Sequence, residues 1–345
     1  MKVFLTGGTG FIGKPLTRQL LKRGWQVTAL VRNPESPQSR ALVEMGAILV
    51  KGDVTDKESM RAGMTGADIA INNAGVYELG VTGREVKRMF EINVQGTENF
   101  LSLAKELNIP RAVHVSSIMY WGDTGSECRD ETWVRESRPV SEYEKSKCEA
   151  HEIALSHQRD GAPIIIACPG TIVGANDHAA FGYFMRMYIN YLLPGFAWSP
   201  NTITVFTEVN EVAEGIALSA EKGRLGETYL LTGEPFIRNK TLEIWASKPG
   251  GIRVLFWSPL WLTSLMFATL EPLQRLVGLP AFISRETARA TSVQMNFSSQ
   301  KAQRELGWTH SPAAKMLSEI VDQEIDLKKK RKKRDLISML KPMDE

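Results

Sequence analysis

Cysteine and histidine are scarce in this sequence, whose 345 residues include three cysteines and five histidines. Cys128, Cys148 and Cys168 form no Cys-x-x-Cys pair, and the histidines do not have the spacing of metal ligands. We therefore predict that the protein has no metal site. The odd number of cysteines, together with the lack of a signal peptide before the first apolar stretch, indicates a reducing compartment, so we expect the protein in the cytoplasm.

The sequence has no excess of basic residues outside one short run. The whole sequence has 42 basic and 39 acidic residues, for a formal net charge of +3. Residues 328–334, KKKRKKR, supply seven of these bases, so the rest of the chain has 35 bases against 39 acids and a net charge of −4. Because a nucleic-acid-binding core needs basic residues spread over a face, we expect no nucleic-acid partner.

The sequence also lacks an apolar run that is suited to span a membrane. Residues 254–270 contain no charge, but as a helix these 17 residues would reach only about 25 Å, against ~30 Å of hydrocarbon, and Pro259 interrupts them. We predict that they form a helical cap over an apolar pocket. Weak contact with a membrane surface through residues 254–270 and 328–340 is the alternative, and the tail is otherwise expected to be a solvated end.

Short apolar strands alternate with helical stretches over the first half of the chain. This alternation predicts an α/β fold, a Rossmann-type doubly wound parallel sheet with helices on both faces and a binding site at the carboxyl ends of its strands. The predicted strands are residues 2–6, 25–32, 47–50, 68–72, 111–117 and 163–170, and the predicted helices lie near 14–24, 36–45, 57–63, 84–107 and 142–159.

Glycine is concentrated in the turn after the first strand. Gly7, Gly10 and Gly13, in TGGTGFIG, have the spacing G-x-x-G-x-x-G between a strand and a helix. Glycine permits a tight turn and close approach of a pyrophosphate to the backbone, and the N-terminus of the helix offers free N–H groups. We predict a dinucleotide-binding turn; a glycine-rich turn without a ligand is the alternative.

The end of the second strand carries Arg32, where a site for NAD usually carries Asp or Glu. A guanidinium pairs with a 2′-phosphate and stacks on adenine, so we predict NADP as the preferred cofactor, with NAD as the alternative. An arginine that only faces solvent is the simpler interpretation. Asp53 and Val54, after the third strand, are candidates to flank the adenine, although an acid in a loop needs no such role.

Tyr143 and Lys147 lie four residues apart in VSEYEKSKCEA, which places them on one face of a helix. Ser141 and Glu144 fit a capping box that starts this helix. An ammonium at ~4 Å, in an effective dielectric near ~20, contributes about 4 kcal/mol. We therefore predict that Lys147 lowers the pKa of the Tyr143 phenol from ~10 and makes it a general acid and base. A chance pair on a surface helix is the alternative.

Two further polar residues support this interpretation. Ser117 ends the fifth strand, from which its hydroxyl can hydrogen-bond the same oxygen that Tyr143 protonates. Asn93 lies in the predicted long helix 84–107, and we expect its amide to hold a water or a backbone carbonyl behind Lys147.

Together these segments resemble the extended branch of the short-chain dehydrogenase/reductase superfamily. That branch contains dihydroflavonol-reductase-like enzymes, 3β-hydroxysteroid dehydrogenases and NAD-dependent sugar-nucleotide epimerases and dehydratases. The resemblance covers about residues 1–235 in order, and residues 298–308 also resemble the branch's C-terminal segment. It is specific for the superfamily and poorly specific for the substrate. The motifs are TGGTGFIG (6–13), NNAG (72–75), NVQGT (93–97), VSS (115–117), YEKSK (143–147) and CPGTIVG (168–174).

The resemblance implies a role for each matching residue. Tyr143 would be the general acid and base, and Lys147 would bind the nicotinamide ribose and lower the pKa of the tyrosine. Ser117 would polarise the substrate, with Ser116 as the fallback, and Asn93 would be the structural asparagine. The predicted cofactor-binding residues are Gly7, Thr9, Gly10, Phe11, Ile12, Gly13, Arg32, Asp53, Val54, Asn73, Ala74, Gly75, Lys147, Pro169, Gly170 and Thr171.

The sequence departs from the family pattern at two positions. Cys168 precedes Pro169 where the family often has arginine, and Trp121 precedes Gly122 where it often has tyrosine. We expect both changes to reshape the substrate pocket without removing a group that the mechanism needs.

The chain divides, by prediction, into a dinucleotide-binding Rossmann domain and a smaller, mostly helical substrate-binding part. Residues 1–170 form the first, with 204–232 packing back on it. Residues 171–203 and 233–325 form the second, which the aromatic-rich segment 181–198 helps to build, and residues 326–345 are a basic tail.

We expect an NADP(H)-dependent oxidoreductase that interconverts a carbonyl and a secondary alcohol on a small, fairly apolar substrate. A sugar-nucleotide epimerase or dehydratase uses the same Tyr/Lys pair and is the first alternative. A non-catalytic NADP-sensing protein on the same fold is the second. The resemblance also implies a homodimer formed through helices beside the active site.

Overall fold

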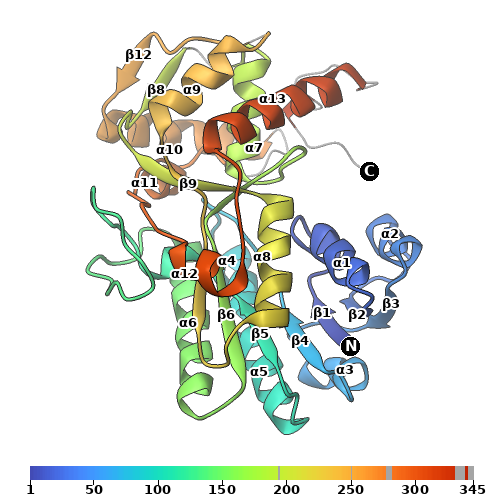
Figure 1. The fold of residues 1–345 in the computed structure, drawn as a ribbon. Helices are drawn as coiled ribbons and strands as arrows, with labels where there is room; N and C mark the ends of the chain where they lie inside the picture. Colours follow the sequence, from blue (N-terminus) through green and yellow to red (C-terminus); the bar gives the residue numbers. More distant parts are fainter. Residues whose placement is uncertain (193–194, 250, 277–281, 331–338, 341–345) are drawn as a thin grey trace.

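A seven-stranded parallel sheet forms the main body of the protein (Figure 1). The computed structural model describes residues 1–192, 195–249, 251–276, 282–330 and 339–340. The strand order is β10-β6-β5-β4-β1-β2-β3, and every neighbouring pair is parallel. The predicted doubly wound Rossmann-type sheet is therefore confirmed. The strands are β1 (Lys2–Thr6), β2 (Gln26–Val31), β3 (Ile48–Lys51), β4 (Ile69–Asn72), β5 (Ala112–Val115), β6 (Ile164–Pro169) and β10 (Thr228–Leu231).

Helices cover both faces of this sheet. Leu16 and Leu20 of α1 and Ile216 of α8 pack against one face, while Met60 of α3 and Phe100 of α5 pack against the other. Strands β4, β5 and β6 are buried along their whole length, as expected for apolar strands covered on two sides. The helices of this body are α1 (Gly13–Lys22), α2 (Pro37–Met45), α3 (Lys57–Met64), α4 (Arg84–Phe90), α5 (Gly96–Glu106), α6 (Glu142–Arg159), α8 (Val209–Lys222) and α12 (Gln300–Leu306).

The chain leaves β1 in one direction toward β3 and then returns to β4 on the other side of β1. This reversal opens a crevice at the carboxyl ends of β1 and β4, the place where open α/β sheets bind ligands. The glycine turn follows β1 directly, and residues 73–75 follow β4. The topology thus brings two of the predicted motifs together.

The predicted continuous helix 84–107 is wrong at its centre. A five-residue π-helical turn, Glu91–Gln95, separates α4 from α5. Asn93 lies in this turn, and its side chain is bonded to the backbone of Val76 and to Ser146. Such π-helical turns are rare and are frequently found at functional sites.

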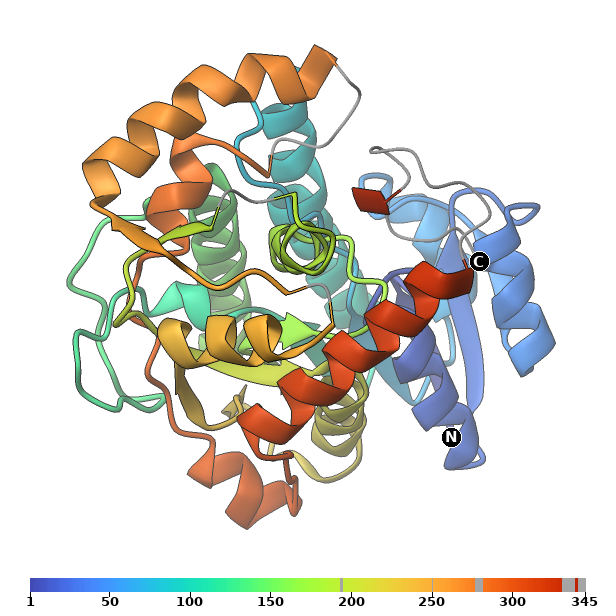
Figure 2. The same ribbon diagram turned by 90° about the horizontal axis from the view of Figure 1, so that it is seen from above.

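A smaller, mostly helical part lies over the carboxyl side of the sheet (Figures 1 and 2). In Figure 2 α10 and α13 form separate ridges, with α7 seen nearly end-on between them. Aromatic rings fill its core, among them Tyr183 stacked on Phe282 with ring centres 4.6 Å apart. Its elements are β7 (Thr171–Val173), α7 (Ala180–Ile189), β8 (Phe196–Trp198), β9 (Ile203–Glu208), β11 (Pro235–Ile237), α9 (Arg238–Ser247), β12 (Phe256–Ser258), α10 (Leu260–Leu276), α11 (Arg285–Ala290) and α13 (Ala313–Lys330).

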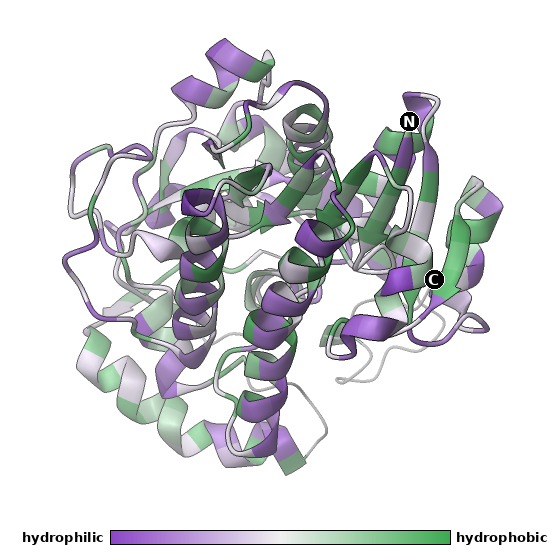
Figure 3. Ribbon diagram, turned by 90° about the horizontal axis from the view of Figure 1, so that it is seen from below, coloured by the Kyte–Doolittle hydropathy of each residue, from purple (hydrophilic) through white to green (hydrophobic). Residues whose placement is uncertain are grey.

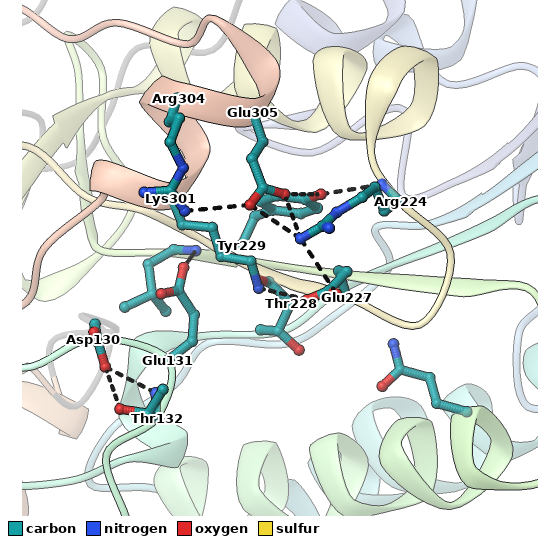
Figure 4. A network of polar contacts seen from close by, with 12 residues as sticks. Asp130, Glu131, Thr132, Arg224, Glu227, Thr228, Tyr229, Lys301, Arg304 and Glu305 are labelled. Carbon is teal, nitrogen blue, oxygen red and sulfur yellow. Dashed lines mark hydrogen bonds and ion pairs between the residues drawn. The ribbon is translucent and has the colours of Figure 1, made fainter.

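Polar side chains from two distant segments cover the outer edge of the sheet, strand β10 (Figure 4). Lys301 of α12 donates from Nζ to the Thr228 carbonyl at 2.7 Å, and the Tyr229 hydroxyl donates to Glu305 Oε2 at 3.0 Å. Glu131 accepts the Leu230 N–H at 3.0 Å. An edge strand otherwise offers unpaired backbone groups to other chains, so these contacts protect it.

None of the helices in the described part of the chain combines the length and the apolar character that crossing a membrane requires. Most of the basic run lies outside the described residues, because residues 331–338 are not among them. Lys328, Lys329 and Lys330 end α13, where Lys328 Nζ donates to the Ile189 carbonyl at 3.0 Å.

Candidate active site

A cavity of about 690 Å³ lies at the carboxyl ends of the strands and is lined from both parts of the molecule. Sites for small molecules typically measure about 300–1,000 Å³, so its size suits such a ligand. Tyr143, Lys147, Ser116 and Ser117 all line it. So do all the predicted cofactor-binding residues except Gly13. The structure therefore brings the glycine turn and the Tyr/Lys pair into one cavity.

The glycine turn forms a tight cradle. Gly7 has a φ of +70°, and a Cβ there would lie 2.7 Å from the Asn73 carbonyl oxygen, so no other residue fits. Gly13 does not line the cavity; a Cβ on it would lie 2.0 Å from the Gly7 carbonyl oxygen, so its lack of a side chain lets α1 pack against the turn.

An unsatisfied polar atom lies beside this cradle. Asn73 donates from Nδ2 to the Gly7 carbonyl at 3.3 Å, while its buried Oδ1 has no hydrogen-bond partner among the described residues. Buried polar atoms are rarely left unpaired, and α1 begins directly after the turn. A cradle that any Cβ would fill, next to an unpaired amide oxygen, fits a bound dinucleotide.

The residues predicted to hold the adenosine end have different surroundings. Arg32 is exposed at the end of β2 and lines the cavity. Asp53 is engaged in its own turn, because its Oδ1 accepts from both the N–H and the hydroxyl of Thr55 at 2.9 Å. Val54 is buried. An exposed guanidinium and a buried apolar side chain are suited to contact a phosphate and an adenine ring, respectively.

Helix α6 carries Tyr143 and Lys147, as the sequence predicts. The Ser141 hydroxyl caps it by accepting the Glu144 N–H at 3.0 Å. Glu144 completes the cap differently from a capping box, since its carboxylate accepts from the N–H of Val140 at 2.7 Å. Both ring and ammonium reach the cavity from the first two turns of the helix.

The predicted effect of the lysine on the tyrosine is wrong in this structure. Burial, with a smaller contribution from the neighbouring Tyr77, raises the pKa of Tyr143 above its ordinary value. The Tyr77 ring stands edge-on to Tyr143 with ring centres 4.6 Å apart. Lys147 directs Nζ to the Val115 carbonyl at 3.0 Å, and burial lowers its pKa to about 8. Desolvation therefore outweighs the expected attraction for a phenolate.

The two serines have different partners. Ser117 begins a short 3₁₀ helix, Ile118–Tyr120, and its Oγ accepts the Met119 N–H at 3.2 Å, which leaves its hydroxyl hydrogen available. Ser116 Oγ is instead paired with His151 Nδ1 at 2.8 Å. Burial lowers the pKa of His151 to about 3, so this ring is neutral. Ser117 is thus a serine whose hydroxyl can donate to a ligand.

Asn93 does not line the cavity. Its Oδ1 accepts from the N–H of Val76 at 2.8 Å, and its Nδ2 donates to the Val76 carbonyl at 3.0 Å and to Ser146 Oγ at 2.9 Å. The expectation that it holds a backbone carbonyl is met: the carbonyl is that of Val76, and the same amide also bonds Ser146, the residue before Lys147. Asn93 joins the loop after β4 to the helix that carries the Tyr/Lys pair.

Aromatic side chains line the end of the cavity formed by the C-terminal part. The segment 181–198 contributes as expected, through Phe181, Phe184, Tyr188 and Trp198. Sequence reasoning missed the contribution of α9. The residues concerned have the spacing i, i+3, i+4 and i+7, which could have indicated one face of a helix. They are Arg238, Thr241, Leu242 and Trp245.

The predicted cap formed by residues 254–270 is wrong, because no residue of that segment lines the cavity. Phe267 is buried against the aromatic core, whereas Trp261 and Leu265 of α10 are 70% and 52% exposed. In Figure 3, α10 runs along the lower left in largely hydrophobic and neutral colours, while the two helices that cross the middle of that view contain many hydrophilic residues. The apolar run therefore faces outward rather than into the pocket.

The chain is similar to known proteins over most of its length. The model of the NAD dependent epimerase/dehydratase family matches residues 3–231. The 4-hydroxy-2-methyl-3-oxo-4-farnesyl-3,4-dihydroquinoline-1-oxide ketoreductase of Stigmatella aurantiaca is 33% identical over 236 residues, which cover 67% of this chain and 68% of that protein. Sterol demethylase protein B of Methylococcus capsulatus is 28% identical over 321 residues, or 89% of this chain and 93% of that one. The crystal structure of gox2253 superposes with a TM-score of 0.75 at 27% identity, covering 95% of this chain and 98% of the other.

Proposed function

This chain belongs to the NAD dependent epimerase/dehydratase family, and we propose that it is an NADP(H)-dependent oxidoreductase of small, fairly apolar substrates. It is an NAD(P)-dependent enzyme of the extended short-chain dehydrogenase/reductase type. In this proposal it interconverts a carbonyl and a secondary alcohol. The observation that carries the proposal is the shared cavity, in which the glycine turn, the Tyr143, Lys147 and Ser117 side chains and an aromatic wall meet.

The cavity residues divide the chemistry among them. A nicotinamide held in this cavity would supply or accept the hydride at the carbon of the carbonyl group. Ser117 donates a hydrogen bond to the substrate oxygen, and Tyr143 passes a proton to it. A pKa above the ordinary value keeps the phenol protonated at neutral pH, which is the form needed to reduce a carbonyl. Lys147 holds the nicotinamide ribose through its buried ammonium.

Asn93 has a positioning role in this proposal. By linking Val76 to Ser146, it fixes the loop after β4 against the turn of α6 that precedes Lys147. The loop residues Asn73, Ala74 and Gly75 would then line the cofactor, and Pro169, Gly170 and Thr171 would contact its nicotinamide; all six line the cavity.

The preference for NADP over NAD rests on Arg32. Its exposed guanidinium lies at the end of β2, and no ion-pair partner is found for it among the described residues. It is therefore free to pair with a 2′-phosphate, which carries the charge that a ribose hydroxyl lacks.

We propose that the two predicted parts of the chain correspond to the two ends of the cavity. We assign residues 1–170, together with 204–232, to cofactor binding, and residues 171–203 and 233–325 to substrate binding. Within 204–232, α8 and β10 pack on the main sheet, whereas β9 pairs with β7 and β11 of the smaller part. The aromatic lining supports an apolar substrate, as does the similarity to a ketoreductase whose name describes a farnesylated 3-oxo compound.

A screen of ketones and aldehydes with the full-length protein tests the proposal, with loss of reduced nicotinamide absorbance as the signal. We expect turnover with NADPH and an apolar carbonyl compound. Sugar-nucleotide epimerisation, the alternative in the same family, requires that the cofactor stay bound through the cycle. NAD released only on denaturation of the purified protein would favour it. Tight NADPH binding without turnover of any compound would favour a cofactor-sensing protein.

The outward face of β12 and α10 supports a contact with a membrane surface. Seven of the fifteen large apolar side chains that are exposed among the described residues lie between positions 255 and 276. Trp261, Leu265 and Leu273 recur at helical spacing along one side of α10. An uncharged apolar stripe that carries a tryptophan is typical of a helix lying in a membrane interface. This surface, the α10 face, consists of Leu255, Phe256, Trp261, Leu265, Leu270, Leu273 and Leu276.

We therefore propose a cytoplasmic enzyme that binds weakly to a membrane surface through the α10 face. An apolar substrate partitions into such a membrane, so the contact would bring the enzyme to its substrate. The basic run at 328–334 would add attraction to anionic lipid. A second copy of the chain is the rival occupant of this face, and the vesicle experiment described below separates the two.

A further inference from the structure

Arg238 places a guanidinium in the aromatic end of the cavity. It is the first residue of α9, and its Cζ lies 5.2 Å from the centre of the Trp198 ring. Nη1 donates to the Trp198 carbonyl at 2.8 Å, and Nη2 donates to the Thr291 carbonyl. A guanidinium has five N–H groups, so three remain beyond these two bonds.

This cation has no counter-ion in the described part of the chain. None of the Asp or Glu residues described there pairs with Arg238. Two other arginines with little exposure show the usual arrangement: Arg186 pairs with buried Glu324 at 3.1 Å, and Arg135 pairs with buried Glu144 at 2.5 Å. Burying a charge without a partner is costly, so such groups are normally paired.

Helix stability does not account for the position of Arg238 either. A cation in the first turn of a helix opposes the macrodipole, and α9 has no acidic residue there to compensate. Burial lowers the pKa of Arg238 to about 10, so the group still carries its charge at neutral pH. Its neighbours Tyr188, Leu242 and Trp245 are aromatic or apolar. Arg238 is half-buried, and its partners among the described residues are two backbone carbonyls and the Trp198 ring, so the remaining N–H groups of this charged donor are open to a ligand in the cavity.

We propose that Arg238 binds a carboxylate of the substrate, so that the enzyme acts on an apolar acid whose carbonyl or hydroxyl group lies at Tyr143 and Ser117. This inference rests on the proposed oxidoreductase function and names its substrate class. A phosphate ester shares the same recognition chemistry. A single cation among aromatic rings matches the single charge of a carboxylate better than the higher charge of a phosphate.

Binding of dodecanoate, dodecanol and dodecyl phosphate to the full-length protein saturated with NADP⁺ tests the proposal. Trp198 and Trp245 line the cavity, so tryptophan fluorescence reports occupancy. We expect dodecanoate to bind at least about tenfold more tightly than dodecanol, because of the charge-assisted hydrogen bonds to Arg238. Equal affinities for the acid and the alcohol in the unaltered protein would overturn the proposal. Binding of dodecyl phosphate tenfold more tightly than dodecanoate would overturn it in favour of a phosphate site.

Variants test whether the preference for dodecanoate depends on Arg238. Arg238→Gln should lose the preference for the acid while it keeps its affinity for dodecanol, and Arg238→Lys should retain part of that preference. Arg285→Gln is the matched control, because Arg285 is also the first residue of a helix but is exposed and does not line the cavity, and it should behave like the unaltered protein. A preference for the acid that survives in Arg238→Gln would refute the assignment.

The readout does not depend on catalysis. The NADP⁺ affinity of each variant shows whether the cofactor end is intact, so a folding defect in Arg238→Gln is recognised. The comparison of dodecanoate with dodecanol in the unaltered protein does not require any variant. Failure of the carboxylate preference leaves turnover of a neutral ketone possible. Lack of turnover with any carbonyl compound would contradict the proposed function, whereas the measured preference for dodecanoate over dodecanol would still stand.

Discussion

The two ends of the cavity are built in different ways. At the cofactor end, short turns after β1, β3 and β4 contribute backbone atoms and glycines, and each turn lies within a few residues of its strand. At the substrate end, side chains come from three separate regions of the chain: α7 with the following strand β8, helix α9, and the segment after α11. Cofactor binding is therefore encoded locally, whereas the substrate pocket exists only once distant segments have packed together.

Replacement of Tyr143 by Phe tests the point where the two ends meet. We expect turnover of a carbonyl substrate to fall by about 10²–10⁴-fold, because the general acid is lost, while NADPH binds as before. Steady-state kinetics and a fluorescence titration measure the two effects. Tyr77→Phe is the control, since it removes a hydroxyl from the ring that contacts Tyr143. A Tyr143→Phe enzyme with activity close to that of Tyr77→Phe would show that another group handles the proton.

Gly7→Ala changes only the cofactor end of the cavity. The added Cβ would meet the Asn73 carbonyl at 2.7 Å in a backbone with φ of +70°, so we expect NADPH binding to be lost and the free energy of unfolding to fall by about 1–3 kcal/mol. Gly24→Ala is the matched control, because Gly24 has a φ of +73° but nothing within 4 Å of the added carbon. It should lose about 1 kcal/mol from backbone strain and bind NADPH normally. NADPH titration and urea unfolding distinguish the variants. Equal NADPH affinities in both variants would contradict the proposal that the glycine turn binds the cofactor.

Arg32→Asp should change which cofactor binds without touching the substrate end. We expect the ratio of NADPH to NADH affinity to fall by about 10–100-fold, because a charge-assisted pair with the 2′-phosphate becomes a repulsion. Arg40→Asp is the control, since this exposed arginine lies on α2 and does not line the cavity. Equal affinities for the two cofactors in the unaltered protein would refute the NADP assignment.

The pKa of Lys147, which burial lowers from 10.5 to about 8, predicts a pH dependence at the cofactor end. NADPH affinity should fall by up to about tenfold between pH ~7 and ~9, because the cation that holds the ribose is lost above its pKa. The same shift acts on stability in the opposite direction: between pH 8 and 10.5 the unfolded chain holds more protons on Lys147, so its contribution to stability rises with pH. Lys147→Arg keeps its charge over this range, and an affinity curve identical to that of the unaltered protein would exclude Lys147 as the titrating group.

The smallest effect concerns the α10 face. Trp261→Glu combined with Leu265→Glu should reduce sedimentation with anionic vesicles several-fold, because charge is placed on the apolar stripe. Val134→Glu combined with Leu225→Glu, two exposed apolar residues elsewhere, should have no effect. Unchanged vesicle binding in the first variant would contradict the membrane proposal. A dimer that this variant dissociates, without any vesicle binding, would assign the face to a second copy.

The same contrast explains what could be predicted from the sequence. The glycine turn and the Tyr143–Lys147 pair depend on spacings of three or four residues, which the sequence displays directly. Val76, the partner of Asn93, lies 17 residues away in the sequence. Asn93 itself lies in a π-helical turn that no local sequence pattern predicted. The burial that raises the pKa of Tyr143 also depends on the assembled pocket, so a lysine four residues away did not predict it.

At the substrate end the sequence was less informative. The aromatic segment 181–198 indicated an apolar wall, but the spacing of Arg238, Thr241 and Trp245 acquires meaning only when α9 faces the cavity. The apolar run 254–270 was assigned to the pocket because hydrophobicity alone does not show which way a helix faces. Its exposed side became evident only from the packing of Phe267.

The contacts of Lys301 and Glu305 with strand β10 also bear on how the protein is made. A ribosome releases the chain from its first residue onward, so β10 emerges about seventy residues before α12 (Gln300–Leu306), which covers it. During that interval only Glu131 is available to cover part of this edge strand, so the edge can still pair with neighbouring chains. Synthesis that stops before α12 would leave the Thr228 carbonyl without Lys301, while Glu131, which is made earlier, could still cover the Leu230 N–H. We expect such a fragment, with its edge strand only partly covered, to be prone to aggregation.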